Sequence, residues 1–174
     1  MSAEIIFDLH LVLGYVAWLL CTGAYIFPKL NEMDPADAQR AIATLHSFRF
    51  FGLVFILPGV VGHHLPAEFA PFAAYGDFAT GLLAILALLT VRIRAVFWPL
   101  VVAFNLVGAA DILIDYYHGV KYGLGTLSGE LGAAYSIVIL YVPLLTITHF
   151  IAFRLMLRRP SKTVRSLAHN AVVS

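Results

Sequence analysis

The chain has 174 residues, of which 61% are hydrophobic and only 12% are charged, and its formal net charge at pH 7 is +1. So many apolar side chains cannot be enclosed in the core of a soluble domain of this length, so the composition argues against a soluble fold and predicts an integral membrane protein. The small net charge, with no basic stripe before the C-terminal tail, argues against a nucleic-acid-binding surface.

Five apolar segments approach or reach the length of about 20 residues that crosses the hydrocarbon core of a bilayer. The first predicted span covers residues 5–27 and ends before a Pro-Lys pair. The second is predicted over residues 35–61, because Asp34 followed by Pro35 is typical of a helix start. Only residues 50–61 of this segment are uniformly apolar, and its first half is amphipathic.

Three further spans follow at short intervals, over residues 72–91, 96–118 and 131–155. A tight turn with two arginines separates the third span from the fourth, and a glycine-rich loop separates the fourth from the fifth. We therefore predict an all-α integral membrane protein, with a bundle of five transmembrane helices in residues 1–157. Residues 158–174 are expected to form a polar cytoplasmic tail.

The basic residues give this map an orientation. Ten of the eleven Lys and Arg residues fall on one face of it: Lys29, Arg40, Arg49, Arg92, Arg94, Arg154, Arg158, Arg159, Lys162 and Arg165. Only Lys121 falls on the other face. Because basic loops stay in the cytoplasm, we expect the N-terminus outside, the C-terminus inside, and a location in the inner membrane of a bacterium. The side chain of Arg49 is expected to reach the lipid phosphates.

Charged side chains inside spans are costly, yet several acids fall in the outer parts of the predicted spans. Asp111, Asp115 and His118 are spaced four and three residues apart, so they share one helix face. If the first and third spans pack beside that face, Asp77 and a polar residue of the first span join them. The resulting candidate site for a ligand or cation consists of Asp77, Asp111, Asp115, His118, Asp8 and His10. Simple contact of these acids with interfacial water is the alternative interpretation.

Such a site suits a divalent metal, a proton-relay carboxylate or the head group of a solute. A second hypothesis is a membrane redox protein, because two histidines lie near each face of the membrane. The alternative haem ligands are His10 and His118 outside and His46 and His149 inside. No motif requires either cofactor, so haem and a divalent metal both stay open. A third hypothesis is an accessory subunit that docks a membrane partner or a second copy of the chain.

The sequence contains no catalytic nucleophile motif, phosphate-binding loop or metalloprotease signature, so it gives no ground for predicting an enzyme, and the question stays open. Two prolines fall within apolar sequence. Pro58 and Pro143 are predicted to interrupt their helices and to free the carbonyls of Val54 and Ile139. A static kink packed by a neighbouring helix is the favoured interpretation of each, and a kink that opens a solute site is the alternative.

Several stretches resemble small, uncharacterised multi-pass proteins of the bacterial inner membrane. They are residues 45–53 (LHSFRFFGL), 57–61 (LPGVV), 74–77 (AYGD), 105–108 (NLVG) with Asp111, and 142–145 (VPLL) with Thr148 and His149. The resemblance would cover nearly the whole chain and implies a bacterial multi-pass protein without an established activity. The first span is also similar in kind to that of the membrane protoporphyrinogen oxidase family, through His10, Trp18, Pro28 and Lys29, but with different spacing.

Overall fold

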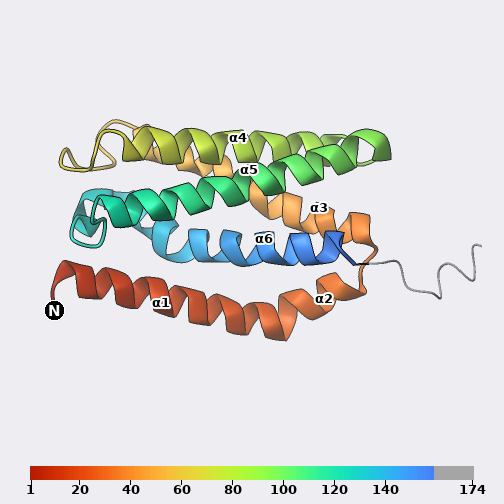
Figure 1. Ribbon diagram of the computed structural model, residues 1–174, viewed down its shortest axis with the longest axis horizontal. Coiled ribbons are helices and arrows are strands. Elements are labelled where there is room, and N and C mark those ends of the chain that lie inside the picture. The colour runs from red at the N-terminus through yellow and green to blue at the C-terminus, as the bar shows by residue number, and fades with distance from the viewer. Residues whose placement is uncertain (159–174) are drawn as a thin grey trace, which may run out of the picture.

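The computed structural model describes residues 1–158, and this part of the chain is helical with no β-strand (Figure 1). The predicted tail, residues 159–174, lies outside the described residues. The first predicted span is confirmed as a helix. It comprises α1 (Ala3–Cys21), a π-helical turn η1 (Thr22–Ile26) and α2 (Phe27–Glu32). Within α1 only Phe7 and Gly14 are buried, so this helix lies against the rest of the bundle through few side chains.

The second predicted span is not one α-helix. Asp34 accepts a hydrogen bond from the Ala36 amide and caps α3 (Pro35–His46), which then continues as a 3₁₀ helix, η2 (Ser47–Ile56). Pro58 ends this helix instead of kinking it, because a residue before proline avoids the α conformation and Leu57 is extended. The prediction that the helix continues to residue 61 was therefore wrong.

The other predicted spans are helical with shifted ends. They correspond to α4 (Phe69–Leu89), α5 (Arg94–Lys121) and α6 (Val142–Met156). A 3₁₀ segment, η3 (Ser128–Ala134), and a π-helical turn, η4 (Ile137–Tyr141), precede α6.

Four helical stretches of the described chain are long and apolar enough to cross a membrane: Ala3–Glu32, Phe69–Leu89, Arg94–Lys121 and Ile137–Met156. The segment of α3 and η2 is not among these four. It nevertheless runs along the bundle behind α5, from the end where α2 lies toward the opposite end (Figure 1). There it packs mainly against α4.

The interior is divided into two apolar clusters. One, at the α2 end of the bundle, includes Ile42, Phe97 and Phe104, and the other includes Phe55 and Phe69. On η2, α4 and α5, the buried residues Arg49, Asp77 and Asp111 lie between the positions that supply these two clusters. A polar layer therefore crosses the middle of the bundle.

At Pro143 the helix is interrupted as predicted: the π-helical turn η4 precedes the proline, and α1 packs against this turn. The α1 backbone at Gly14 lies against the carbonyl of Ile139, where no larger residue would fit. One turn along α1, the indole Nε1 of Trp18 donates a hydrogen bond of 2.8 Å to the carbonyl oxygen of Leu140. The backbone groups around the proline are thus covered by α1.

Candidate functional site

The polar layer is built around Arg49, whose side chain is only 1% exposed. Its Nε donates to Asp77 Oδ1 on α4 at 2.6 Å, and its Nη2 donates to Asp111 Oδ2 on α5 at 2.5 Å. The expectation that Arg49 reaches the lipid phosphates is therefore wrong. A guanidinium whose fork engages two carboxylates on two other helices fixes the relative position of η2, α4 and α5.

The 3₁₀ geometry of η2 explains why Arg49 points inward. A 3₁₀ helix has three residues per turn, so side chains three positions apart lie directly above one another. His46, Arg49, Gly52 and Phe55 follow this spacing and are all buried. The switch from α to 3₁₀ helix thus keeps this one face turned to the interior.

The remaining nitrogen of Arg49 contacts α5 and α6. Its Nη1 donates to the Gly108 carbonyl at 3.2 Å and lies 3.3 Å from His149 Nε2. Because a guanidinium has no acceptor, His149 Nε2 must accept, so its proton is on Nδ1. Nδ1 then donates to Asn105 Oδ1 at 2.9 Å, and the Asn105 amide donates to the Val101 carbonyl at 2.9 Å. His149 is therefore held as a neutral, oriented imidazole.

His46 stacks on His149, with ring centroids 4.1 Å apart. The Thr148 hydroxyl donates to the Leu144 carbonyl, so it accepts at 3.0 Å from His46 Nε2. His46 and His149 thus contact each other directly, and both nitrogens of His149 have protein partners. Axial haem ligands would instead stand on opposite faces of a porphyrin with one nitrogen of each directed at the iron.

Three glycines leave room for the charged groups. A Cβ atom at Gly52 would overlap the carboxylate of Asp77, and one at Gly76 would overlap that of Asp111. A Cβ atom at Gly108 would press on both Arg49 and His149. The close approach of the backbones of η2, α4 and α5 at these positions is what encloses the network.

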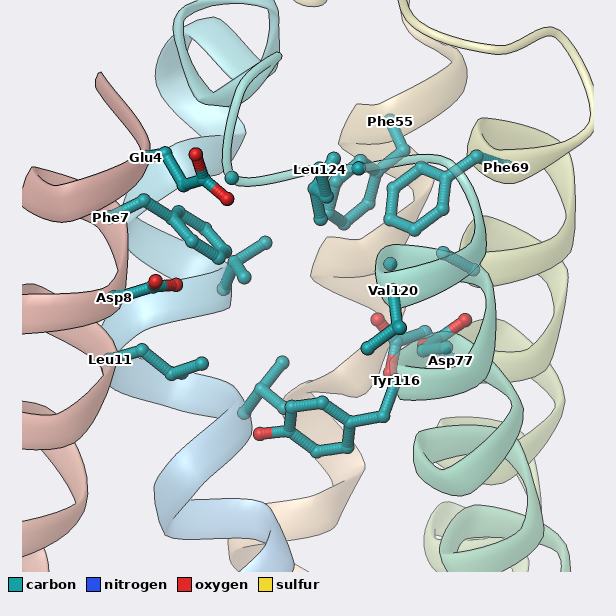
Figure 2. Close-up of a pocket in the computed structure, with 17 residues that line it drawn as sticks. Glu4, Phe7, Asp8, Leu11, Phe55, Phe69, Asp77, Tyr116, Val120 and Leu124 are labelled. Carbon is teal, nitrogen blue, oxygen red and sulfur yellow. The ribbon is translucent and has the colours of Figure 1, made fainter. Parts of the chain in front are cut away.

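A cavity of about 310 Å³ adjoins the network at the end of the bundle away from α2, between α1 and the helices that carry Asp77 and Asp115 (Figure 2). Glu4 and Asp8 lie on its α1 wall, across from Asp77 and Tyr116 (Figure 2). Most of the remaining wall is apolar: Phe7, Leu11, Phe55, Phe69, Ala73, Val120, Leu124, Val138 and Val142. The cavity therefore combines an apolar body with carboxylates.

The network contains more carboxylates than cationic side chains. Asp111 Oδ1 and Asp115 Oδ1 are buried and have no hydrogen-bond partner among the described residues. Of these acids, only Asp77 and Asp111 form ion pairs in the described part of the chain, and both pair with Arg49. One guanidinium thus faces three carboxylates, those of Asp77, Asp111 and Asp115.

The structure brings together some of the predicted site residues and separates others. Asp77, Asp111 and Asp115 lie together, and Asp8 lines the cavity that reaches them. His10 instead bonds the Tyr135 hydroxyl at 2.8 Å, and neither His10 nor His118 lines the cavity. Within residues 1–158, no group of three or more His, Cys, Asp or Glu side chains has the arrangement of a metal site.

His118 packs instead against the ring of Phe72, with centroids 5.0 Å apart. Two polar contacts beside the cavity were not predicted from the sequence. The hydroxyl of Tyr15 on α1 lies 2.6 Å from that of Tyr116 on α5 and donates to Thr146 Oγ1 on α6 at 3.1 Å. These side chains join three helices, and because they are far apart in the sequence, no spacing within one helix could have indicated the contacts.

An all-helical bundle with four membrane-length apolar helices and a buried charged network defines the class of this protein. Residues 6–157 match the family described as "Domain of unknown function (DUF8737)", and the chain belongs to that family. No curated protein and no solved structure matches the chain. The expected resemblance to uncharacterised proteins is confirmed to that extent.

Proposed function

We propose that the protein crosses the inner membrane of a bacterium five times and binds a small organic cation in an outward-facing cavity. The crossing added to the four apolar helices is the segment of α3 and η2, which is second in chain order and whose interior face carries Arg49. The orientation is supported by most of the described basic residues. The elements that carry Lys29, Arg40 and Arg154, namely α2, α3 and the end of α6, lie at the end opposite the cavity (Figure 1), as does the turn between α4 and α5, whereas Lys121 ends α5 beside the cavity. The cavity then opens toward the outside.

The observation that supports a cation is the charge imbalance at the inner end of the cavity. Surplus negative charge in a membrane interior is costly, so protons or a bound cation must offset it. Asp77 and Asp115 both reach the cavity, whereas Arg49 does not line it. A cation in the cavity therefore meets carboxylates without meeting the guanidinium.

The side chains that line the cavity favour one kind of cation. Aromatic and aliphatic side chains suit an ammonium group with an apolar body, since aromatic faces attract cations, and they suit a hydrated metal ion poorly. A cavity of about 310 Å³ has the size of a small organic ligand. A small organic ammonium ion is therefore the solute that fits best.

The test compares organic ammonium ions with neutral molecules of the same shape, using calorimetry on the purified protein. We expect the ammonium ions to bind, the neutral isosteres to bind at least tenfold more weakly, and Asp115→Asn to abolish that difference. Binding should weaken as the pH falls, because protons compete for the same carboxylates. Asp37→Asn, at an exposed acid that pairs with Arg40, is the matched control and should bind normally.

Equal binding of charged and neutral isosteres, or full binding by Asp115→Asn, would contradict the proposal. A visible spectrum of the same sample tests the redox alternative. A Soret band lost in His149→Ala would favour haem over a solute site.

A further inference from the structure

A second hollow lies on the side of the bundle where α1 and α2 meet α6. It is a groove of about 400 Å³ and shares no lining residue with the cavity. Its lining residues are Leu19, Thr22, Gly23, Phe27, Ile147, Phe150, Ile151 and Arg154. The groove therefore follows two helices toward the basic end of the bundle.

The body of the groove is apolar and open to the side. Phe150 is 72% exposed and Leu19 is 56% exposed, so both present apolar surface to the surroundings. Gly23 lies in the π-helical turn η1, and no atom comes within 4 Å of the position that its Cβ would take. Because Gly23 has no side chain, the groove is unobstructed at this position.

Two polar groups line this apolar groove. The guanidinium of Arg154 lies over the ring of Phe27, 4.9 Å from its centroid, and forms no ion pair within residues 1–158. Thr22 is only 5% exposed, yet its hydroxyl has no hydrogen-bond partner among the described residues. A buried hydroxyl normally bonds a nearby backbone carbonyl or a ligand.

We propose that this groove binds an anionic phospholipid of the basic leaflet. An acyl chain lies against Leu19, Ile147 and Ile151, the lipid phosphate pairs with Arg154, and the Thr22 hydroxyl donates to an ester oxygen. The direction agrees with the fold, because Arg154 follows Ile147 and Ile151 along α6 and so lies nearer the basic end of the bundle. Arginine is the side chain best suited to bind a phosphate through two parallel hydrogen bonds. This site does not depend on the proposed cation cavity.

Native mass spectrometry of the purified full chain tests the proposal, using equal amounts of phosphatidylglycerol and phosphatidylcholine with matched acyl chains. We expect the wild-type protein to retain phosphatidylglycerol preferentially, and Arg154→Gln to reduce its affinity for that lipid roughly tenfold, the effect of losing a charge-assisted hydrogen bond to the phosphate. Thr22→Val should weaken both lipids, since both carry ester oxygens. Arg94→Gln removes the same charge at the same end but outside the groove, and should change nothing.

Gly23→Leu provides a second variant that keeps every charge. The leucine has free space and should exclude the acyl chain, so retention of both lipids should fall while Arg154 is intact. The proposal is overturned if wild type shows no preference for the anionic lipid. It is also overturned if Arg94→Gln matches Arg154→Gln, since the charge then acts only through the general surface potential, or if Gly23→Leu retains lipid like wild type.

Discussion

Replacement of Arg49 by methionine is the sharpest test of the buried network. The substitution leaves Asp77 and Asp111 buried without the cation to which both are bonded, at 2.6 and 2.5 Å. Removing one partner of a buried ion pair costs about 3–5 kcal/mol, because the charge that remains is uncompensated. For a chain of this size, 1 kcal/mol shifts the melting temperature by roughly 2–4 °C. We therefore expect a decrease on the order of 10 °C.

The matched rescue is the triple variant Arg49→Met, Asp77→Asn, Asp111→Asn. Replacing a whole buried ion group by neutral side chains is often close to neutral in stability. The triple variant should therefore melt well above Arg49→Met, even though it carries more substitutions. The assay is thermal unfolding in detergent, followed by tryptophan fluorescence and by loss of the monodisperse peak in size-exclusion chromatography.

Two results would refute this reasoning. If Arg49→Met melts within 2–3 °C of wild type, equivalent to about 1 kcal/mol, the guanidinium is not compensating buried charge. If the triple variant is less stable than the single one, shape and hydrogen bonding dominate, not charge. Arg49→Lys separates these contributions further, because lysine keeps the charge but loses the planar fork.

Two further predictions concern packing around the same layer. Gly76→Ala should lower the melting temperature markedly, because the new methyl group would overlap the Asp111 carboxylate. The control Gly129→Ala should be tolerated, because no atom lies within 4 Å of its Cβ position. Equal melting temperatures of the two variants would contradict the close approach at Gly76. Trp18→Phe should cost about 1 kcal/mol by removing the hydrogen bond to the Leu140 carbonyl. Amide exchange around residue 140, measured by mass spectrometry, should rise in that variant, and unchanged exchange would count against the bond.

The charged residues of α4 and α5 were the most predictable part of the site. Asp111 and Asp115 share a helix face by their spacing alone, and the cost of burying charge predicts that Asp77 joins them. Arg49 could not be placed in the same way. The expectation of a continuous α-helix gives the wrong period for residues 46–55, and an arginine near a basic loop normally extends to the interface.

In the fold as well, features set by local sequence could be predicted, and features set by contacts between distant residues could not. Helix existence follows from apolar length, and the Asp34–Pro35 start was found because its capping chemistry is local. The pairing of His46 with His149 depends on contacts about a hundred residues apart, which spacing within one helix does not encode. The separation of His10 and His118 from the acids has the same origin.

The shallow seating of α1 has a mechanical consequence. This helix provides one wall of the cavity but buries only two of its own residues, so its attachment relies mainly on a few contacts such as Tyr15 with Tyr116 and Trp18 with Leu140. Displacing α1 breaks far fewer interactions than rearranging Arg49 and the two aspartates bonded to it. If the cavity binds a solute as proposed, a ligand too large for its opening would therefore enter at least cost by displacing α1.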